Sequence, residues 1–480
     1  MRGVAVWTAG VHRRHEGGDG GVSGEAESEL RGIVAVRGSP LECRGDFVHG
    51  LLETDAGTRF GGSFGGPVER PSEAGPILLY SVHVRSFPPL VPTAFVVLSE
   101  LELRHFRNLG IQELRFPPEG VAVIGENAQG KTNLLEAIYY LESFRSFRGA
   151  GDGELTEFAK DVFHLRGSVQ GDRPATVAAG FDRKRKRKRV SVDGNDSVRI
   201  SEALGHLGAV VFSPADVDLV NGGPRLRRRF LDILLSLNVG GYVGALSGYR
   251  KALAQRNAAL KADAGAMAVR AWDGLLVESG ARVTRARAEW VAERAGTFTR
   301  YCSAISGRDP VTMSYRPDLP LRGSGGANDE GTGAEDASVP GEDTIRERFH
   351  ARLEESWGTD LRRGVTTCGP HRDDLVFAIA SKQRALPVRT FGSGGQRRTA
   401  ALALRLTEAA TIRSQRGVDP ILLLDDAFAE LDERRSERVM ALLQDECTGQ
   451  VILTAPKESD VRLRGPSLAR WSIREGTIEA

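Results

Sequence analysis

The chain has 480 residues, and its 40% hydrophobic and 27% charged residues are ordinary for a folded protein of one large domain or two. The formal net charge is only +2, so overall charge does not indicate a nucleic-acid-binding protein, and any such signal must be local. The cysteines are far apart and show no CxxC pair or metal-ligand spacing, which excludes a disulfide framework. We therefore expect a cytoplasmic protein.

The sequence gives no sign of a membrane span or an export signal. The most apolar stretch of sufficient length, Pro76–Leu98, is interrupted by prolines and by His83 and Arg85. The first residues lack the sustained apolar core of a signal peptide. We expect no membrane partner.

Residues 1–96 are rich in Gly, Pro, Ser, Glu and Arg and include the glycine-rich run Gly17–Gly21. They show no sustained period of 2 or 3.6 residues. We expect a disordered extension here, with the first strand signal only at Leu101–Leu103.

The region 97–205 contains the strongest local motif. The apolar run Val121–Ile124 predicts a buried strand, and residues 133–144 predict a helix. The eight residues from 125 match the phosphate-binding pattern GxxxxGK[ST] in the required strand, loop and helix context. They are Gly125, Glu126, Asn127, Ala128, Gln129, Gly130, Lys131 and Thr132.

Each residue type in this Walker A motif has a chemical task. Glycines let the loop wrap closely around phosphates, and free N–H groups at the helix start meet the negative charge. Lys131 is expected to reach the β- and γ-phosphates of ATP and to assist catalysis, and Thr132 is expected to ligate Mg²⁺. A chance glycine turn before a helix is rejected because both flanking elements match.

A run of seven cations follows later in the same region: Arg183, Lys184, Arg185, Lys186, Arg187, Lys188 and Arg189. Like charges in such a run repel one another, and a phosphate backbone would relieve the repulsion. Nothing in the run can read bases, so we expect sequence-independent, salt-sensitive DNA binding. A solvated loop or strand remains the alternative. The turn signal Asp193–Gly194 predicts a β-hairpin after the run.

Region 206–363 predicts a helical arm, because between Arg225 and Ser306 it is rich in Ala, Leu, Arg and Glu with amphipathic periodicity. Within it, residues 321–343 have almost no bulky apolar side chains and predict a flexible loop. Thr344 and Glu347 form a candidate capping box for a helix that continues to about Trp357.

Region 364–480 supplies two further motifs. Before an alanine- and leucine-rich helix stands an SGGQ turn, a second phosphate-binding surface with Ser393 as the helix cap. Its residues are Ser393, Gly394, Gly395 and Gln396. Because one nucleotide hardly needs two such surfaces, we expect this turn to contact ATP held by another subunit, in a homodimer. A plain glycine-rich helix start is the alternative.

The second motif is the apolar run Ile421–Leu424 followed by two acids, which predicts a buried parallel strand with carboxylates at its C-terminal end. In this Walker B pattern, Asp425 is expected to hold Mg²⁺ and Asp426 to orient or activate the attacking water. A strand ending in acids is by itself only a turn signal. The Walker A motif makes the functional interpretation the better one.

The ordered set of Walker A, SGGQ, Walker B and the triplet Glu430-Leu431-Asp432 resembles the ABC/SMC ATPase superfamily, with Asp432 in its D-loop. The resemblance implies an α/β P-loop ATPase head built from two sequence halves, with the helical arm inserted between them. Arg107 resembles the arginine that approaches the phosphates in SMC-like heads, although a surface arginine is the alternative.

A finer resemblance is to the RecF family, through residues 105–109, 145–148, 212–220, 368–375 and 422–432. That family implies an ATP-dependent homodimer that binds single- and double-stranded DNA and hydrolyses ATP slowly, stimulated by DNA. It also implies loading of RecA at gaps together with RecR and RecO, in support of SOS induction.

Two other classes of protein fit this sequence less well. The nucleotide-binding subunit of an ABC transporter would place its signature closer to Walker A, and its switch histidine is replaced here by Thr454. An SMC-like structural protein would need a longer coiled-coil arm. Finally, the resemblance begins at Leu98, so residues 1–96 are expected to lie outside the functional fold, either through a start codon assigned too far upstream or as a real flexible tail.

Overall fold

The computed structural model describes residues 96–480 except 173, 197–198, 308–310, 322–337, 380–384, 427–430, 447–448 and 462–467, together with the backbone of residues 31–36, 50–53, 59–62 and 78–83. The chain divides into two units, 1–92 and 93–480. In the first, the backbone forms two antiparallel strand pairs, β1 with β4 and β2 with β3. Their bounds are β1 (Arg31–Val36), β2 (Gly50–Glu53), β3 (Arg59–Gly62) and β4 (Leu78–His83). These strands lie within the stretch expected to be disordered, and the rest of that expectation lies outside the described residues.

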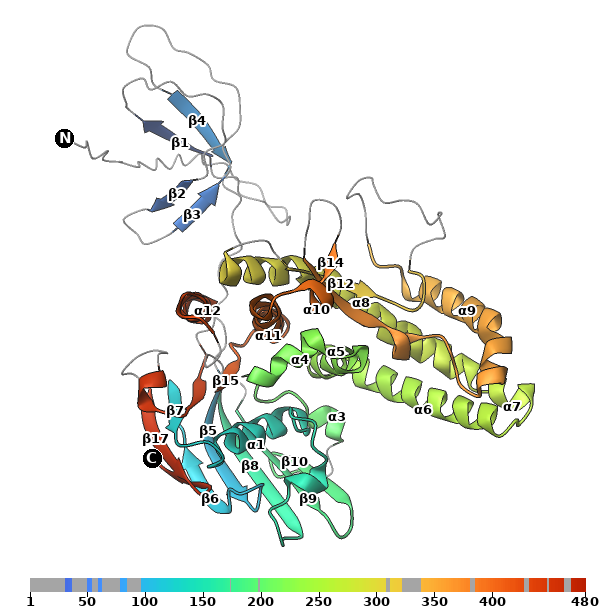
Figure 1. Ribbon diagram of the computed structural model, residues 1–480, viewed down its shortest axis with the longest axis horizontal. Coiled ribbons are helices and arrows are strands. Elements are labelled where there is room, and N and C mark those ends of the chain that lie inside the picture. The colour runs from blue at the N-terminus through green and yellow to red at the C-terminus, as the bar shows by residue number, and fades with distance from the viewer. Residues whose placement is uncertain are drawn as a thin grey trace, which may run out of the picture. The chain divides into compact units, whose positions relative to one another are not determined.

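A six-stranded sheet forms the centre of the second unit, in the order β11-β15-β16-β7-β17-β18 (Figure 1). Its strands are β7 (Gly120–Ile124), β11 (Ala209–Phe212), β15 (Ile421–Asp425), β16 (Val451–Ala455), β17 (Ala469–Arg474) and β18 (Thr477–Glu479). All neighbours are parallel except β17 and β18. Strands β7, β11, β15 and β16 are mostly apolar and buried along almost their whole length, as expected for parallel strands covered on both faces.

A five-stranded antiparallel sheet, in the order β10-β9-β8-β5-β6, lies beside it. Its strands are β5 (Val96–Arg104), β6 (Ile111–Arg115), β8 (Val162–Gly171), β9 (Ala175–Asp182) and β10 (Arg187–Val192). Helix α1 (Lys131–Ser143) contacts strands of both sheets. Almost every residue of α1 is buried for this reason. The short helices α2 (Asp152–Leu155) and α3 (Ile200–Ala203) flank this sheet.

The inserted helices extend away from the sheets (Figure 1). They are α4 (Val217–Asn221), α5 (Pro224–Asn238), α6 (Tyr242–Lys261), α7 (Ala266–Arg270), α8 (Asp273–Ser306) and α9 (Glu342–Arg363). Where α6, α8 and α9 meet, they bury a second apolar cluster that includes Tyr249, Leu276 and Phe349. The expected set of long amphipathic helices is therefore present.

Buried ion pairs attach this arm to the rest of the unit. Arg287 of α8 contacts Asp232 of α5 at 2.8 Å and Asp373, before β13 (Asp374–Ile379), at 3.0 Å. Arg227 of α5 forms two hydrogen bonds with Asp374, at 2.7 and 3.0 Å. Because unpaired charges are costly to bury, these pairs fix how the arm meets the strands.

Two expected boundaries of the arm need correction. Strand β11 lies inside the span 206–363 but pairs with β15 in the central sheet, so the arm begins after Phe212. Helix α9 begins at Glu342 with Gly341 as its cap, so Thr344 lies inside the helix and caps nothing. Both errors have one cause, because short apolar runs and helix starts are ambiguous until their tertiary partners are known.

The ordered part of the second unit also begins earlier than the sequence predicts. Strand β5 begins at Val96, whose partner on β8 is Gly171, and Val96, Val97 and Leu98 are buried. The expectation that order begins at Leu101 is therefore wrong, and a chain started at Val97 would lose a strand residue. No helix among the described residues has the length and apolarity to cross a membrane.

The remaining elements carry the C-terminal motifs. Strands β12 (Val311–Arg316), β13 and β14 (Leu386–Pro387) form a small antiparallel sheet. Helix α10 (Val388–Phe391) leads into α11 (Gly394–Arg416), and α12 (Glu433–Glu446) precedes β16.

Candidate nucleotide site and nucleic-acid surface

The Walker A loop joins the C-terminal end of β7 to α1, as the sequence predicts. A Cβ atom at Gly130, where φ is +115°, would stand 2.8 Å from Asn108 Oδ1. A Cβ at Gly125 would stand 2.5 Å from the Ile473 carbonyl oxygen. Both positions therefore need glycine, one for backbone conformation and space and the other for space alone.

Lys131 is buried at the first position of α1. Its Nζ donates hydrogen bonds to the carbonyl oxygens of Gly125 at 2.7 Å and Glu126 at 3.0 Å. The ammonium group is thus held across the mouth of the loop, where it can exchange these carbonyls for phosphate oxygens.

The Walker B acid Asp425 reaches the Walker A motif through the sheet. Because β7 and β15 both run parallel to β16, their C-terminal ends meet at one edge. Thr132 Oγ1 donates to Asp425 Oδ1 at 2.8 Å, and Thr454 Oγ1 donates to the same oxygen at 3.0 Å. Burial raises the pKa of Asp425, while the two hydroxyl donors oppose that rise. A hydroxyl beside a carboxylate is the all-oxygen donor set that suits Mg²⁺.

Asp426 has a different environment from its neighbour. Its backbone is left-handed, with φ of +44°, and its N–H donates to Thr454 Oγ1 at 3.2 Å. Its Oδ1 is buried and accepts no hydrogen bond from the described part of the chain. Burial raises the pKa of this carboxyl, and Lys131 opposes that rise. A buried acceptor without a partner is a group that can take a proton or orient a water molecule.

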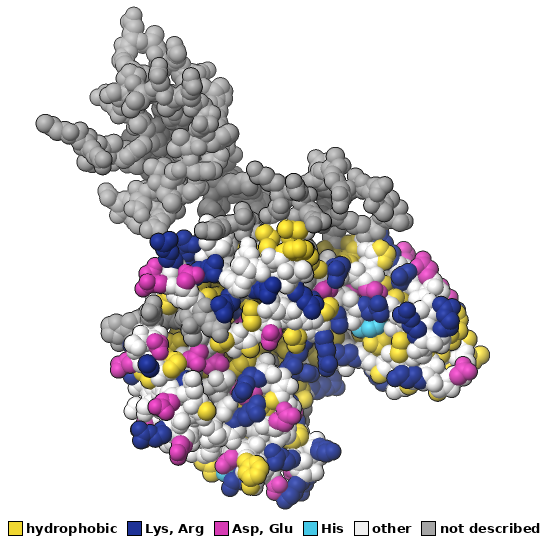
Figure 2. Space-filling model, in the orientation of Figure 1, with side chains coloured by type: hydrophobic (Ala, Val, Ile, Leu, Met, Phe, Trp, Pro, Cys, Tyr) yellow, Lys and Arg dark blue, Asp and Glu magenta, His cyan; other side chains and the backbone are white. Residues whose placement is uncertain are grey.

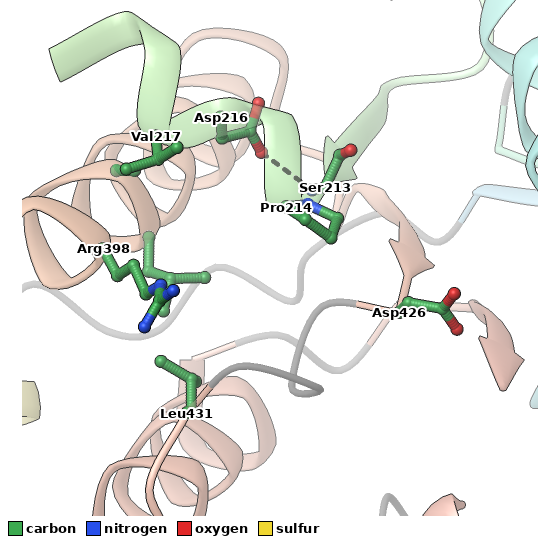
Figure 3. A pocket seen from close by; sticks show the side chains of 9 residues that line it. Ser213, Pro214, Asp216, Val217, Arg398, Asp426 and Leu431 are labelled. Carbon is green, nitrogen blue, oxygen red and sulfur yellow. Dashed lines mark hydrogen bonds between the residues drawn. The ribbon is translucent and has the colours of Figure 1, made fainter. Parts of the chain in front are cut away.

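Asp426 also lines a small cavity of about 30 Å³ (Figure 3). The opposite wall comes from α11, through Arg398 and neighbouring residues, with Ser213 and Pro214 above and Leu431 below in Figure 3. That volume exceeds the roughly 10–15 Å³ that one water molecule needs. The Walker B acid and the helix behind the SGGQ turn therefore border the same small cavity.

The SGGQ turn caps α11 as expected. Ser393 Oγ accepts the Gln396 N–H at 3.2 Å, and Gln396 Oε1 accepts the Ser393 N–H at 2.8 Å. Ser393 is exposed. Within the described part of the chain, no hydrogen bond or ion pair joins 393–396 to 125–132.

Sequence reasoning missed a link between this turn and the D-loop. Asp432 accepts the Arg435 N–H at 3.0 Å and forms an ion pair with its guanidinium at 3.4 Å. The same guanidinium lies over Gly395, where an added Cβ would stand 2.0 Å from Arg435 Nη1. No motif in the sequence marked Arg435.

Arg107 is not a free surface arginine. It forms a two-point ion pair with the fully buried Glu136 of α1, at 2.9 and 3.1 Å, and donates to the Glu154 carbonyl at 3.1 Å. A role toward phosphate stays a prediction, and it would require exchange of one of these partners.

Two polar residues beside the loop were also missed. Asn108 donates to the Gln129 carbonyl at 3.2 Å and accepts from Asn133 Nδ2 at 2.8 Å, so it supports the Walker A backbone. Thr454 joins both Walker B acids. The position of Asn108 directly after Arg107 was the available signal.

The cationic run 183–189 forms the turn between β9 and β10 and continues into β10, and the turn predicted at Asp193–Gly194 is present, closed by an antiparallel bridge between Val192 and Asn195. Residues 183–186 connect β9 to β10, and the run continues along β10. Alternation along β10 then separates the charges, with Arg187 and Arg189 exposed and Lys188 facing inward. The side chains of Arg187 and Arg189 form no hydrogen bond or ion pair within the described part of the chain.

Lys188 needs correction as a DNA-contacting residue. Its Nζ donates to the Phe144 carbonyl at 2.7 Å, pairs with Asp152 at 2.9 Å and lies 5.0 Å from the centre of the Tyr140 ring. Burial lowers the pKa of this ammonium, and Asp152 opposes the change. Lys188 therefore stabilises the fold.

The outer face of β8, β9 and β10 carries a groove of about 330 Å³. Small residues on the central strand, Ala178 and Gly180, form part of its floor. Gly180 is paired with Arg189 on one side and His164 on the other, so larger side chains border the floor. Arg185 and Arg187 also line it. The basic turn thus continues into a basic groove.

Known proteins are similar to this chain over most of its length. Residues 97–465 match the model of the family described as "RecF/RecN/SMC N terminal domain". A "DNA replication and repair protein RecF" from Alkaliphilus oremlandii is 33% identical over 397 residues, which are 80% of this chain and 100% of that protein.

Two solved structures are similar in fold and sequence. One is described as "recombination mediator protein RecF-ATPrS in RecFOR pathway", with a TM-score of 0.70, 32% identity, and coverage of 81% of this chain and 99% of the other. The other is the corresponding RecF-ATP structure, also with a TM-score of 0.70 and 32% identity, covering 80% and 97%.

Proposed function

The chain belongs to the RecF family, and from that premise we propose that it is an ATP-dependent DNA-binding protein of DNA replication and recombinational gap repair. It binds single- and double-stranded DNA without sequence specificity, forms a homodimer on ATP, and hydrolyses ATP slowly when DNA is present. With RecR and RecO it helps to load RecA, and so supports SOS induction.

One observation carries the nucleotide part of this proposal: the Thr132 hydroxyl lies 2.8 Å from the Asp425 carboxylate across two sequence halves. Those two groups would hold Mg²⁺, and Lys131 would hold the β- and γ-phosphates of ATP. The bound ion would neutralise charge on the phosphates. Asp426, beside the cavity, is the group placed to orient water.

The dimer part rests on the SGGQ turn. Ser393 is exposed and its N-capped helix presents free N–H groups and a positive dipole end. Because nothing in the described chain joins this turn to its own Walker A loop, the turn is available to the ATP of a second copy. Asp432, linked to Gly395 through Arg435, would lie at the same interface.

The DNA part rests on the exposed cations of the β9–β10 turn and groove. Arg185, Arg187 and Arg189 line one groove, and a phosphate backbone is the polyanion that such a row fits. The transporter alternative is weaker, because Thr454 stands where the switch histidine would be and is engaged with Asp425.

The test is to size the purified chain with and without ATP and gapped duplex DNA, beside Lys131→Ala and Lys131→Arg. We expect a dimer only for the unchanged chain with ATP, and ATPase activity stimulated by DNA. Both variants should lose most nucleotide use, since the ammonium at the β- and γ-phosphates is removed or reshaped. Unchanged ATP binding and hydrolysis in both variants would refute the site. Activity that does not respond to DNA would favour a transporter subunit.

A further inference from the structure

Phe158 is the most exposed large hydrophobic side chain of the described residues, at 94%. It stands on a tight turn in which the Lys160 N–H donates to the Glu157 carbonyl at 3.1 Å. The next residue, Ala159, has φ of +62°, a left-handed conformation that costs energy for any residue with a Cβ. The chain therefore holds a strained turn that presents an aromatic ring to solvent.

This turn is firmly anchored beneath the ring. The Glu157 N–H donates to the His105 carbonyl at 2.9 Å, and the side chains of the same two residues meet at 2.6 Å. The Arg107 N–H donates to the Leu155 carbonyl at 2.7 Å. An aromatic side chain on a fixed backbone loses little conformational entropy when it binds a flat partner.

The basic β9–β10 turn packs directly on this anchored segment. Lys184 Nζ pairs with Asp161 at 2.6 Å, and the Arg183 N–H donates to the Asp161 carbonyl at 2.8 Å. The Arg183 guanidinium donates to the Gly153 carbonyl at 2.7 Å. Lys160 and Asp161, the second and third residues after Phe158, are also exposed.

The groove begins at the same place. Val162, four residues after Phe158 and the first residue of β8, is exposed and lines the groove together with Arg185 and Arg187. Figure 2 shows hydrophobic, basic and acidic side chains together at the lower edge of the molecule, where Figure 1 places the ends of β8, β9 and β10.

We propose that Phe158 is a stacking platform for an unpaired base of single-stranded DNA, whose phosphates follow the cations of the groove. This inference rests on the proposed DNA-binding function and adds strand preference to it. Bases in a duplex have their faces covered by their neighbours, whereas every unpaired base offers a face to an aromatic ring. The exposed arginines of the groove, Arg185, Arg187 and Arg189, favour a nucleic acid over a protein as the occupant.

The experiment measures affinity of the full chain for a labelled single-stranded oligonucleotide, the same strand with abasic sites, and a blunt duplex. Phe158→Ala should weaken binding of the normal strand about tenfold, a loss typical of one stacked base, and leave the duplex unchanged. Phe158→Trp should restore strand binding. Abasic sites should weaken the unchanged chain and make no difference to Phe158→Ala.

Met267→Ala is the matched control, because Met267 is also highly exposed, at 88%, but lies on α7 of the arm. It should bind all three probes like the unchanged chain. Equal loss on strand and duplex by Phe158→Ala, or no loss at all, overturns the inference, as does insensitivity of the unchanged chain to abasic sites. Loss of a protein partner with DNA binding intact also overturns it, since Phe158 would then be a protein contact.

A double variant, Arg187→Ser with Arg189→Ser, distinguishes the proposed DNA site at the hairpin from the stacking role of Phe158. If it binds DNA like the unchanged chain, with the same salt dependence, the proposed DNA site at the hairpin fails. If it loses affinity while Phe158→Ala does not, the DNA site stands and only the stacking role fails.

Discussion

Two adjacent acids at the end of β15 have unlike surroundings. Asp425 is buried and accepts hydrogen bonds from Thr132 and Thr454. Asp426 turns into a left-handed backbone, and its Oδ1 lies buried without a partner from the described chain, beside the small cavity. The same side chain type can therefore serve metal binding at one position and water activation at the next.

Asp426→Asn should retain ATP but slow its cleavage, since Asp425 and Thr132 remain to hold Mg²⁺ while the proton acceptor is lost. ATP-bound dimers should therefore accumulate, as sedimentation with ATP can measure. Asp425→Asn is the comparison variant and should weaken nucleotide binding itself. Faster dissociation of Asp426→Asn dimers than of the unchanged dimers would show that the assigned role is wrong.

Substitutions of neighbouring cations on β10 should likewise have different effects, one on stability and the other on DNA binding. Lys188→Ala removes the cation paired with Asp152, which then keeps only its hydrogen bond from Tyr140, and should cost about 1–3 kcal/mol of unfolding free energy, with little change in the salt dependence of DNA binding. Arg187→Ala should change stability little and reduce the salt dependence of DNA binding, because its exposed guanidinium forms no hydrogen bond or ion pair with a described residue. Urea denaturation and DNA titrations at several salt concentrations measure both effects. A larger loss of salt dependence in Lys188→Ala than in Arg187→Ala contradicts this assignment.

At the scale of elements, α11 connects the two functional edges of the unit. Its N-terminal turn carries the exposed Ser393, and its flank at Arg398 faces the cavity that Asp426 lines. Further along, Arg405 is buried in ion pairs with Asp216 at 2.5 Å and Glu408 at 2.7 Å. A helix fixed at its middle in this way holds its N-terminus in a defined position.

Ser393→Arg should allow ATP binding by the monomer and block ATP-dependent dimerisation, because bulk and charge would enter the proposed interface. Ser393→Thr keeps a capping hydroxyl and serves as the control, so it should dimerise. Sedimentation with ATP measures dimers, and a separate ATP-binding assay verifies the site. Normal ATP dimers of Ser393→Arg would place the interface elsewhere.

At the scale of the whole molecule, the functional unit depends on its first strand. Val96, Val97 and Leu98 are buried, and the Leu98 N–H donates to Gln450 Oε1 at 3.0 Å. Gln450 directly precedes β16, so β5 connects the antiparallel sheet to the central sheet.

A chain begun at Thr93 should melt like the full chain, whereas one begun at Glu100 should be strongly destabilised. Each lost Val or Leu side chain contributes about 1.5–3 kcal/mol of burial, and the sum approaches the roughly 5–15 kcal/mol of a typical protein. Thermal unfolding followed by circular dichroism measures the difference. Equal melting temperatures for the two shortened chains would mean that the first strand residues are dispensable. Mass spectrometry of the native N-terminus addresses the start-site question independently.

The sequence by itself determined the motifs of the candidate nucleotide site. Walker A, Walker B and the SGGQ cap are local patterns, because the residues next to each motif specify the strand or helix that carries it. The loop after β7, the strand β15 and the Ser393 cap are examples. The family resemblance and the α/β head with inserted helices followed from the same motifs. Such motifs are predictable because the hydrogen bonds and apolar periodicity that define them involve residues close together in the sequence.

Only the tertiary structure decided what depends on contacts between distant segments. The Thr132–Asp425 bond, the Arg107–Glu136 pair and the Arg435 contact with Gly395 each join separate elements. Likewise, only the structure shows that β11 pairs with β15 in the central sheet. The side chain of Lys188 faces inward, unlike those of Arg187 and Arg189, because sheet pairing sets which face of a strand is buried. The sequence of a segment gives its charge and hydrophobicity, but it does not show which residues of distant segments will contact each side chain.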